Sequence, residues 1–225
     1  MHSGYIILLV ICIVALVVLT LNIAVVQTSN NITLKYICMI LFIFSIFRYL
    51  TLMVYGDMPS YELLNALRYF YFATSLGLTV PTLAAIWYIT PLYREKIKYP
   101  TYLLLFTPWM LFYLYVIIMQ PTRIIVDKKF GYNLQLIGNF NLYLSIAQGS
   151  FVIIVLILCL VGIIKYKNAK LRSRYFAIII AHIALTLDGL SYFYSSFDII
   201  PQFTLTEVLG FLAILYAFRE RIKVK

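Results

Sequence analysis

The chain has 225 residues, of which 64% are hydrophobic and 12% are charged, and its net charge is +10. A soluble domain carries about twice that charged fraction, and several apolar runs exceed the ~20 residues that cross a bilayer, so the composition predicts an integral membrane protein. The basic residues lie in short segments beside apolar runs, which is typical of membrane topology and argues against nucleic-acid binding.

The apolar runs predict a single domain over residues 1–225, an all-α integral membrane bundle of seven transmembrane helices. The first run has no basic segment before it and no small-residue cleavage site after it, so we expect a retained helix rather than a signal peptide. The predicted helices cover approximately residues 5–26, 34–55, 60–91, 101–119, 138–165, 175–197 and 203–218.

The third predicted helix, over residues 60–91, organises the bundle. Ser60 is its expected N-cap, and one face of an otherwise apolar surface is polar. That face consists of Asn65, Arg68, Ser75, Thr79 and Thr82. An intramembrane arginine is tolerated only at a cost of roughly 2.5–3.5 kcal/mol on insertion scales, so we expect this face to be turned into the bundle.

Polar residues also interrupt four other predicted helices. The second helix carries Arg48 past its middle. Residues 120–137 form the link after the fourth helix, and within it Ile124-Ile125-Val126 and Phe130-Gly131-Tyr132, on either side of Asp127-Lys128-Lys129, are predicted to form a small β-hairpin. The later helices carry Asn141, Ser145 and Gln148 on one face of the fifth, His182 and Asp188 in the sixth, and Glu207 near the start of the seventh.

The basic residues predict the orientation of the bundle. If the N-terminus is outside, thirteen Lys and Arg residues lie on the cytoplasmic side and three on the outer side, while Arg48 and Arg68 lie within helices. This distribution follows the positive-inside rule. We therefore predict an extracytoplasmic N-terminus and a cytoplasmic C-terminus.

In this orientation, polar residues of five helices reach similar depths in the outer half of the membrane, and Arg68 lies roughly 12 Å below the surface at 1.5 Å per residue. Three interpretations stay open: structural ion pairs, an outward-facing cavity for a small polar or anionic ligand, and a proton or ion pathway. The candidate ligand-binding residues are Arg48, Arg68, Asp188, Glu207, Gln148, Asn141 and Tyr192.

The sequence indicates no cofactor, no metal site and no enzyme activity. His182 is interpreted as a core histidine, because the other histidine, His2, provides no second ligand from a pair of helices. The three cysteines fall inside apolar runs and are interpreted as packing residues. A retinal Schiff base needs a lysine in the last helix, which has none before Lys223.

Short segments spread over the chain carry a family resemblance: Arg68-Tyr69, Pro81 to Tyr88, Tyr93-Arg94, Gln120-Pro121-Thr122, Leu171-Arg172 and Leu215-Tyr216-Ala217-Phe218-Arg219. They resemble the N-terminal seven-helix sensor region of bacterial histidine kinases, over about Val10 to Arg221. The resemblance implies a sensing or binding module in a bacterial plasma membrane. The chain departs from that family because it stops after the seventh helix, with no phosphate-accepting histidine and no nucleotide-binding segment.

The sequence and the resemblance together predict a stand-alone seven-helix sensor or receptor-like protein. It would bind a small polar or lipid ligand from the extracytoplasmic side and signal through a membrane or cytoplasmic partner protein. A small-solute transport subunit and a structural or immunity-type membrane subunit are the alternatives. The lipid bilayer is the expected surrounding, and no nucleic-acid partner is expected.

Overall fold

The computed structural model describes residues 3–57, 59–127, 131–194 and 203–219, which are mostly α-helical. The elements in chain order are α1 (Ser3–Gln27), α2 (Ile32–Gly56), α3 (Tyr61–Leu67), the 3-10 turn η1 (Arg68–Phe70), α4 (Ala73–Ile89), α5 (Pro91–Lys96), α6 (Tyr99–Leu104), α7 (Thr107–Met119), β1 (Thr122–Asp127), β2 (Gly131–Leu136), α8 (Phe140–Lys165), α9 (Ala169–Tyr194) and α10 (Thr204–Phe218).

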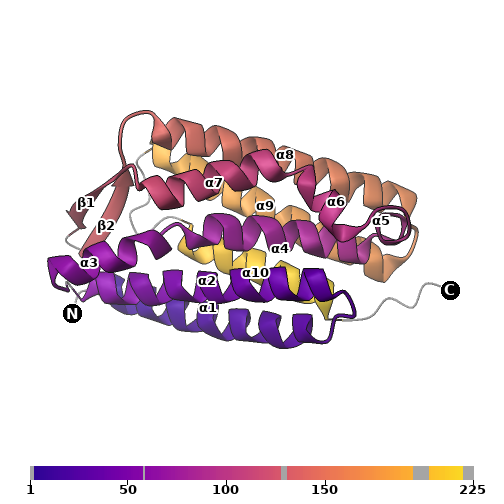
Figure 1. Ribbon diagram of the computed structural model, residues 1–225, viewed down its shortest axis with the longest axis horizontal. Helices are drawn as coiled ribbons and strands as arrows, with labels where there is room; N and C mark the ends of the chain where they lie inside the picture. The colour runs from indigo at the N-terminus through magenta and orange to yellow at the C-terminus, as the bar shows by residue number, and fades with distance from the viewer. Residues whose placement is uncertain (1–2, 58, 128–130, 195–202, 220–225) are drawn as a thin grey trace.

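Among the described residues, five helical stretches are long and apolar enough to cross a bilayer, so the chain is an all-α, multi-pass membrane protein. They are Gly4–Gln27, Ile32–Gly56, Tyr61–Ile89, Phe140–Lys165 and Ala169–Leu190. Two shorter apolar helices, α7 and α10, have 13 and 15 residues. Figure 1 shows both lying alongside the longer helices, with the β-hairpin at the end of the bundle that holds the N-terminus.

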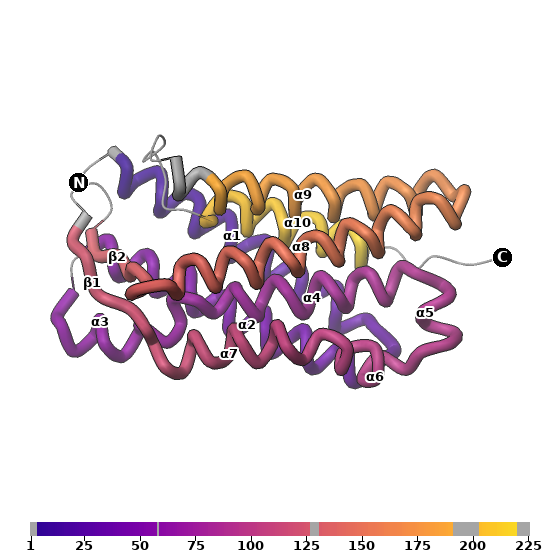
Figure 2. The backbone as a smooth tube through the Cα atoms, turned by 90° about the horizontal axis from the view of Figure 1, so that it is seen from above, coloured from indigo at the N-terminus to yellow at the C-terminus, as the bar shows by residue number. Residues whose placement is uncertain are grey.

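The helix α4 lies in the interior of the bundle, where it contacts α2, α10 and α7 (Figures 1 and 2). The helix α1 packs on α2 and α10, and α9 packs on α8 and α10. Most side chains of α4 are buried, whereas α1 and α8 expose many large apolar side chains. Apolar residues on an outer surface are expected where lipid is the solvent.

Two glycines allow α4 to approach its neighbours closely. A Cβ added at Gly77 of α4 would lie 1.8 Å from the Ser45 Oγ of α2. A Cβ added at Gly210 of α10 would lie 2.7 Å from the side chain of Leu78. Small residues at helix contacts let backbones come together where association depends on close packing, so these two positions set the spacing around α4.

The helix predicted over residues 60–91 is interrupted in the structure. It is divided into α3, η1 and α4, and the Ser75 N–H donates to the carbonyl of Phe72 instead of that of Tyr71. Residues 68–72 are a run of bulky side chains with four consecutive aromatics, and aromatic residues lose side-chain freedom in a helix. The Tyr71 carbonyl is thereby left for another donor, which is Arg48.

The helix predicted over residues 101–119 is also divided, into α6 and α7. Pro108 occupies the first turn of α7, where its missing N–H removes no helical hydrogen bond. Because proline is tolerated there and disfavoured within a helix, the chain ends α6 at Leu104 and starts a new helix at Thr107.

The predicted β-hairpin is confirmed. Strands β1 and β2 pair antiparallel, with a register from Thr122 opposite Leu136 to Asp127 opposite Gly131. Leu134 and Leu136 of β2 are buried. Gly131 has a φ of 84° and its Cα faces the backbone at the end of α2, so a side chain at this position would meet both strain and a clash.

Candidate functional site

A buried ion pair joins α2 to α10. The Arg48 Nε lies 3.0 Å from the Glu207 Oε2, and the two residues are 5% and 7% exposed. Arg48 comes from the second half of α2, and Glu207 from the first turn of α10, where a carboxylate also interacts favourably with the helix dipole. The sequence had placed both residues at a similar depth, and the structure brings them into contact.

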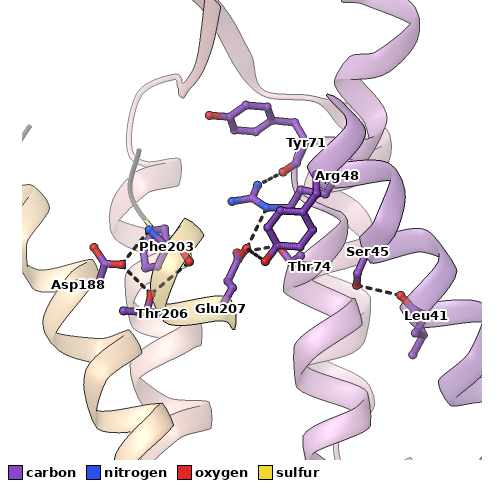
Figure 3. A network of polar contacts seen from close by, with 10 residues as sticks. Leu41, Ser45, Arg48, Tyr71, Thr74, Asp188, Phe203, Thr206 and Glu207 are labelled. Carbon is purple, nitrogen blue, oxygen red and sulfur yellow. Dashed lines mark hydrogen bonds and ion pairs between the residues drawn. The ribbon is translucent and has the colours of Figure 1, made fainter. Parts of the chain in front are cut away.

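Two hydroxyl groups complete the hydrogen bonding of the Glu207 carboxylate. Thr74 of α4 donates to Oε1 over 2.7 Å, and Tyr49 of α2 donates to Oε2 over 3.2 Å. Transfer of each ion from water costs several kcal/mol, and a buried pair offsets that cost only when further hydrogen bonds satisfy the remaining lone pairs. These donors supply that condition and tie α2, α4 and α10 together (Figure 3).

The Arg48 guanidinium also reaches the interruption between η1 and α4. Its Nη1 donates to the Tyr71 carbonyl, and its carbon atom Cζ lies 5.4 Å from the centre of the Tyr71 ring. The Tyr71 hydroxyl in turn donates to the Asn133 Oδ1 of β2. A continuous set of contacts therefore runs from the β-hairpin through Tyr71 and Arg48 to Glu207 of α10, and we call it the Arg48–Glu207 network.

Arg68 belongs to a different group of contacts. Its Nη2 donates to the Thr122 Oγ1 over 2.8 Å, to the Thr122 carbonyl over 3.2 Å and to the Gln120 carbonyl over 3.3 Å. These acceptors lie where α7 leads into β1. Arg68 thus connects η1 with the base of the hairpin, and it lies apart from the Glu207 carboxylate to which Arg48 binds.

Asp188 of α9 binds the start of α10. Its Oδ2 accepts from the Phe203 N–H over 2.9 Å and from the Thr206 hydroxyl over 2.6 Å. A carboxylate at a helix N-terminus binds unsatisfied N–H groups and complements the dipole. Figure 3 shows Asp188 and Glu207 on opposite sides of α10, so the two carboxylates serve different helix contacts.

The other predicted ligand-binding residues lie on α8 and α9. Asn141 and Gln148 are half-buried on α8, and the Asn141 carbonyl accepts from the Ser145 hydroxyl over 2.8 Å. Tyr192 falls near the end of α9, and its side chain lies outside the described part of the structure. The expected gathering of Arg48, Arg68 and Asp188 thus resolves into separate groups of contacts.

Sequence reasoning missed Tyr49, Thr74 and Tyr71 as members of the network. Two of them are adjacent in the chain to a selected residue, since Tyr49 follows Arg48 and Thr74 precedes Ser75. A search for hydroxyl groups next to intramembrane charges would have found Tyr49, and a search for hydroxyl groups next to the predicted polar face would have found Thr74. The role of Tyr71 depends on its backbone carbonyl, for which the sequence carries no signal.

His182 lies in the core of the bundle. It is 2% exposed, its Nδ1 lies 2.9 Å from the Ile178 carbonyl, and its ring centre lies 6.2 Å from that of Phe151. Within the described residues, no group of three or more His, Cys, Asp and Glu side chains is arranged to hold a metal ion. The interpretation of His182 as a core residue fits these contacts.

No protein-family model, no curated protein and no solved structure matches the chain.

Proposed function

We propose that this protein is a seven-crossing sensor or receptor-like module of a bacterial plasma membrane. It receives a small polar or lipid ligand on its extracytoplasmic side and signals through a partner protein. The count of seven adds α10 and the α6–α7 segment, which covers 99–119, to the five long helical stretches.

The distribution of charge along the bundle supports the proposed orientation. The N-terminus and the hairpin lie at one end, while α5 and the connection between α8 and α9 lie at the other (Figures 1 and 2). Arg94 and Lys96 of α5 belong to the basic end, as do Lys165 and Lys167. Because cytoplasmic loops carry the excess of Lys and Arg, we assign this end to the cytoplasm.

The observation that carries the proposal is the Arg48–Glu207 network. It joins the hairpin, which lies on the assigned outer side, to α10, which runs toward the assigned cytoplasmic side. A ligand that moves the hairpin changes the position of Tyr71, and Tyr71 positions the Arg48 guanidinium. The network therefore provides a physical connection between an outer surface and the last described helix.

Energetics favour a transition in which the ion pair moves without breaking. Leaving one buried charge of such a pair without its partner costs about 3–5 kcal/mol, whereas coupling free energies between distant sites are about 1–3 kcal/mol. A ligand shifts an equilibrium only by its differential affinity for the two states. We therefore infer that α10 shifts together with Arg48, with the Arg48–Glu207 contact retained.

The proposal is tested by hydrogen exchange of the purified full chain in a neutral detergent. Tyr71→Phe removes the hydroxyl that binds Asn133 and keeps the ring, and Tyr69→Phe is the matched control because Tyr69 is 48% exposed. We expect faster exchange in both the hairpin and α10 for Tyr71→Phe, and wild-type exchange for Tyr69→Phe. Faster exchange confined to the hairpin would show that the network carries no coupling and would overturn the proposal.

A further inference from the structure

The two arginines within the predicted helices differ in their charge compensation. Arg48 is paired with the carboxylate of Glu207. Arg68 donates from Nη2 to two backbone carbonyls and one hydroxyl group, all of which are neutral, and no carboxylate among the described residues pairs with it. A half-buried cation whose described neighbours are all neutral acceptors leaves its charge available to a ligand.

Most of the donors of the Arg68 guanidinium remain without a partner in the described part of the chain. A guanidinium has five N–H donors, and the contacts of Arg68 all use Nη2. The Nε–H is buried and finds no acceptor among the described residues, and neither does Nη1. A planar cation with several unused donors matches the oxygens of a phosphate or carboxylate group.

The acceptors of Arg68 are shielded from solvent. Gln120, whose backbone carbonyl accepts from Arg68, is 8% exposed, and Thr122 is 7% exposed. Thr122 adds a hydroxyl 2.8 Å from Nη2. These residues lie at the hairpin base, at the end of the bundle assigned above to the outer side (Figure 1). We call Arg68, Gln120 and Thr122 the hairpin-base site.

We propose that the hairpin-base site binds an oxyanion, a phosphate or carboxylate group, with Arg68 as its cationic donor. The oxyanion belongs to a lipid headgroup or to a free solute, since both present the same oxygens at the membrane surface. This inference rests on the proposed function, from which it takes the assignment of the hairpin to the outer side of the membrane. It adds the chemical class of the ligand. It also separates the roles of the two arginines, because Arg48 holds the helices together and Arg68 binds the ligand.

The experiment measures thermal unfolding of the purified full chain in maltoside detergent, which contains no phosphate. In one arm, sodium phosphate and sodium acetate are compared with sodium chloride at equal ionic strength. In the other arm, phosphatidylglycerol is compared with diglucosyl diacylglycerol, which lacks phosphate. We expect a rise in the unfolding midpoint of about 2–4 °C with the oxyanion. A rise with free anions identifies a solute, and a rise with phosphatidylglycerol alone identifies a lipid.

Three variants connect the rise to the site. Arg68→Gln is expected to abolish the rise. Thr122→Asp is expected to abolish it too, because the Thr122 side chain contacts Nη2 and a carboxylate there competes with the oxyanion while Arg68 stays in place. This variant carries the test if Arg68→Gln does not fold. Arg123→Gln is the control, since Arg123 is exposed in β1 and donates to Gln135, and it is expected to retain the full rise.

Two results overturn the assignment. The first is a wild-type midpoint that responds to neither the free anions nor phosphatidylglycerol. The second is a rise that persists in Arg68→Gln or Thr122→Asp. Thermal unfolding and hydrogen exchange in α10 are independent measurements. If the oxyanion raises the midpoint but Tyr71→Phe leaves exchange in α10 unchanged, only the proposed sensor function is rejected. If Tyr71→Phe speeds exchange in α10 but no oxyanion raises the midpoint, only the hairpin-base site is rejected.

Discussion

Arg48 and Glu207 stand 159 positions apart in the chain, yet their side chains meet at 3.0 Å between α2 and α10. Their contact connects the second helix of the bundle to the last described one. Both charges are removed from solvent, so each is stabilised mainly by the other. Glu207 also accepts from the hydroxyl groups of Tyr49 and Thr74, and Arg48 donates to the Tyr71 carbonyl. The stability of the whole bundle therefore depends strongly on whether both charges are present.

Neutralising one charge is expected to destabilise more than removing both. Glu207→Gln leaves Arg48 buried without a counterion and is expected to lower the free energy of unfolding by about 3–5 kcal/mol. The double variant Arg48→Leu with Glu207→Leu is expected to recover much of that loss, since apolar pairs replace buried ion pairs at little cost. Thermal unfolding in mild detergent measures both. The control is Glu62→Gln at an exposed carboxylate, and a double variant no more stable than Glu207→Gln would contradict the expectation.

The Thr74 hydroxyl is expected to contribute through the Glu207 carboxylate. Thr74→Val preserves the shape of the side chain and removes a donor to a charged group, which is expected to destabilise by about 1.5–3 kcal/mol. Thr51→Val is the matched control, because Thr51 is equally buried and its hydroxyl donates to Phe47 of its own helix. Equal losses in the two variants, measured by unfolding midpoints, would show that the carboxylate gains nothing from Thr74.

Gly77 is expected to tolerate no side chain. Gly77→Ala places a Cβ against the Ser45 hydroxyl and 3.0 Å from the Leu41 carbonyl of α2. Overpacking of this kind destabilises by about 1–3 kcal/mol. Gly149→Ala is the control, since a Cβ there meets nothing within 4 Å. Partial rescue by Ser45→Gly would assign the loss to this contact, and a neutral Gly77→Ala would mean that the two helices separate freely.

The proposed orientation predicts which positions react with a membrane-impermeant maleimide. Val126 of β1 is 58% exposed, and Lys167 lies exposed in the connection before α9. Val126→Cys is expected to be labelled in intact cells, and Lys167→Cys only after the cells are permeabilised. The native cysteines Cys12, Cys38 and Cys159 are each 0% exposed and should give little background. The reverse pattern of labelling would show that the bundle has the opposite orientation in the membrane.

Apolar length and turn signals were enough to predict an all-α membrane protein with a hairpin between its fourth and fifth predicted helices. Hydrophobicity is a property of whole segments, so the sequence reports it reliably. The ends of the helices were less predictable. The interruption at residues 68–72 frees the Tyr71 carbonyl, and the donor that satisfies it, Arg48, comes from another helix. Local sequence does not contain that partner.

The sequence was enough to predict the depth of each polar residue in the membrane, but not the direction in which its side chain points around the helix axis. Counting residues along each helix placed Arg48 and Glu207 at one level, and they pair. The same count placed Arg68 and Asp188 nearby, yet η1 directs Arg68 to Thr122, and Asp188 binds the start of α10. The azimuth of a side chain depends on how each helix packs on its neighbours, which the spacing of residues in one helix does not specify.

Asn22 shows a missed signal. It was included in an almost wholly aliphatic predicted helix, but it is 0% exposed, and its Nδ2 donates to the carbonyls of Val18 and Phe211 at 3.0 Å each. A single amide within an apolar run points to an interhelical hydrogen bond, since lipid offers no acceptor. That signal predicts that the Asn22 face of α1 is turned toward another helix, which the structure identifies as α10.

The separation of the two charged partners along the polypeptide also constrains biogenesis. As the ribosome elongates the chain, α2 enters the bilayer long before α10 has been made. During that interval the guanidinium must remain near the lipid headgroups or a translocation channel, because the hydrocarbon offers it no counterion. Closure of the bundle thus awaits α10, and a nascent chain that stalls before Glu207 keeps an unpaired cation at the membrane.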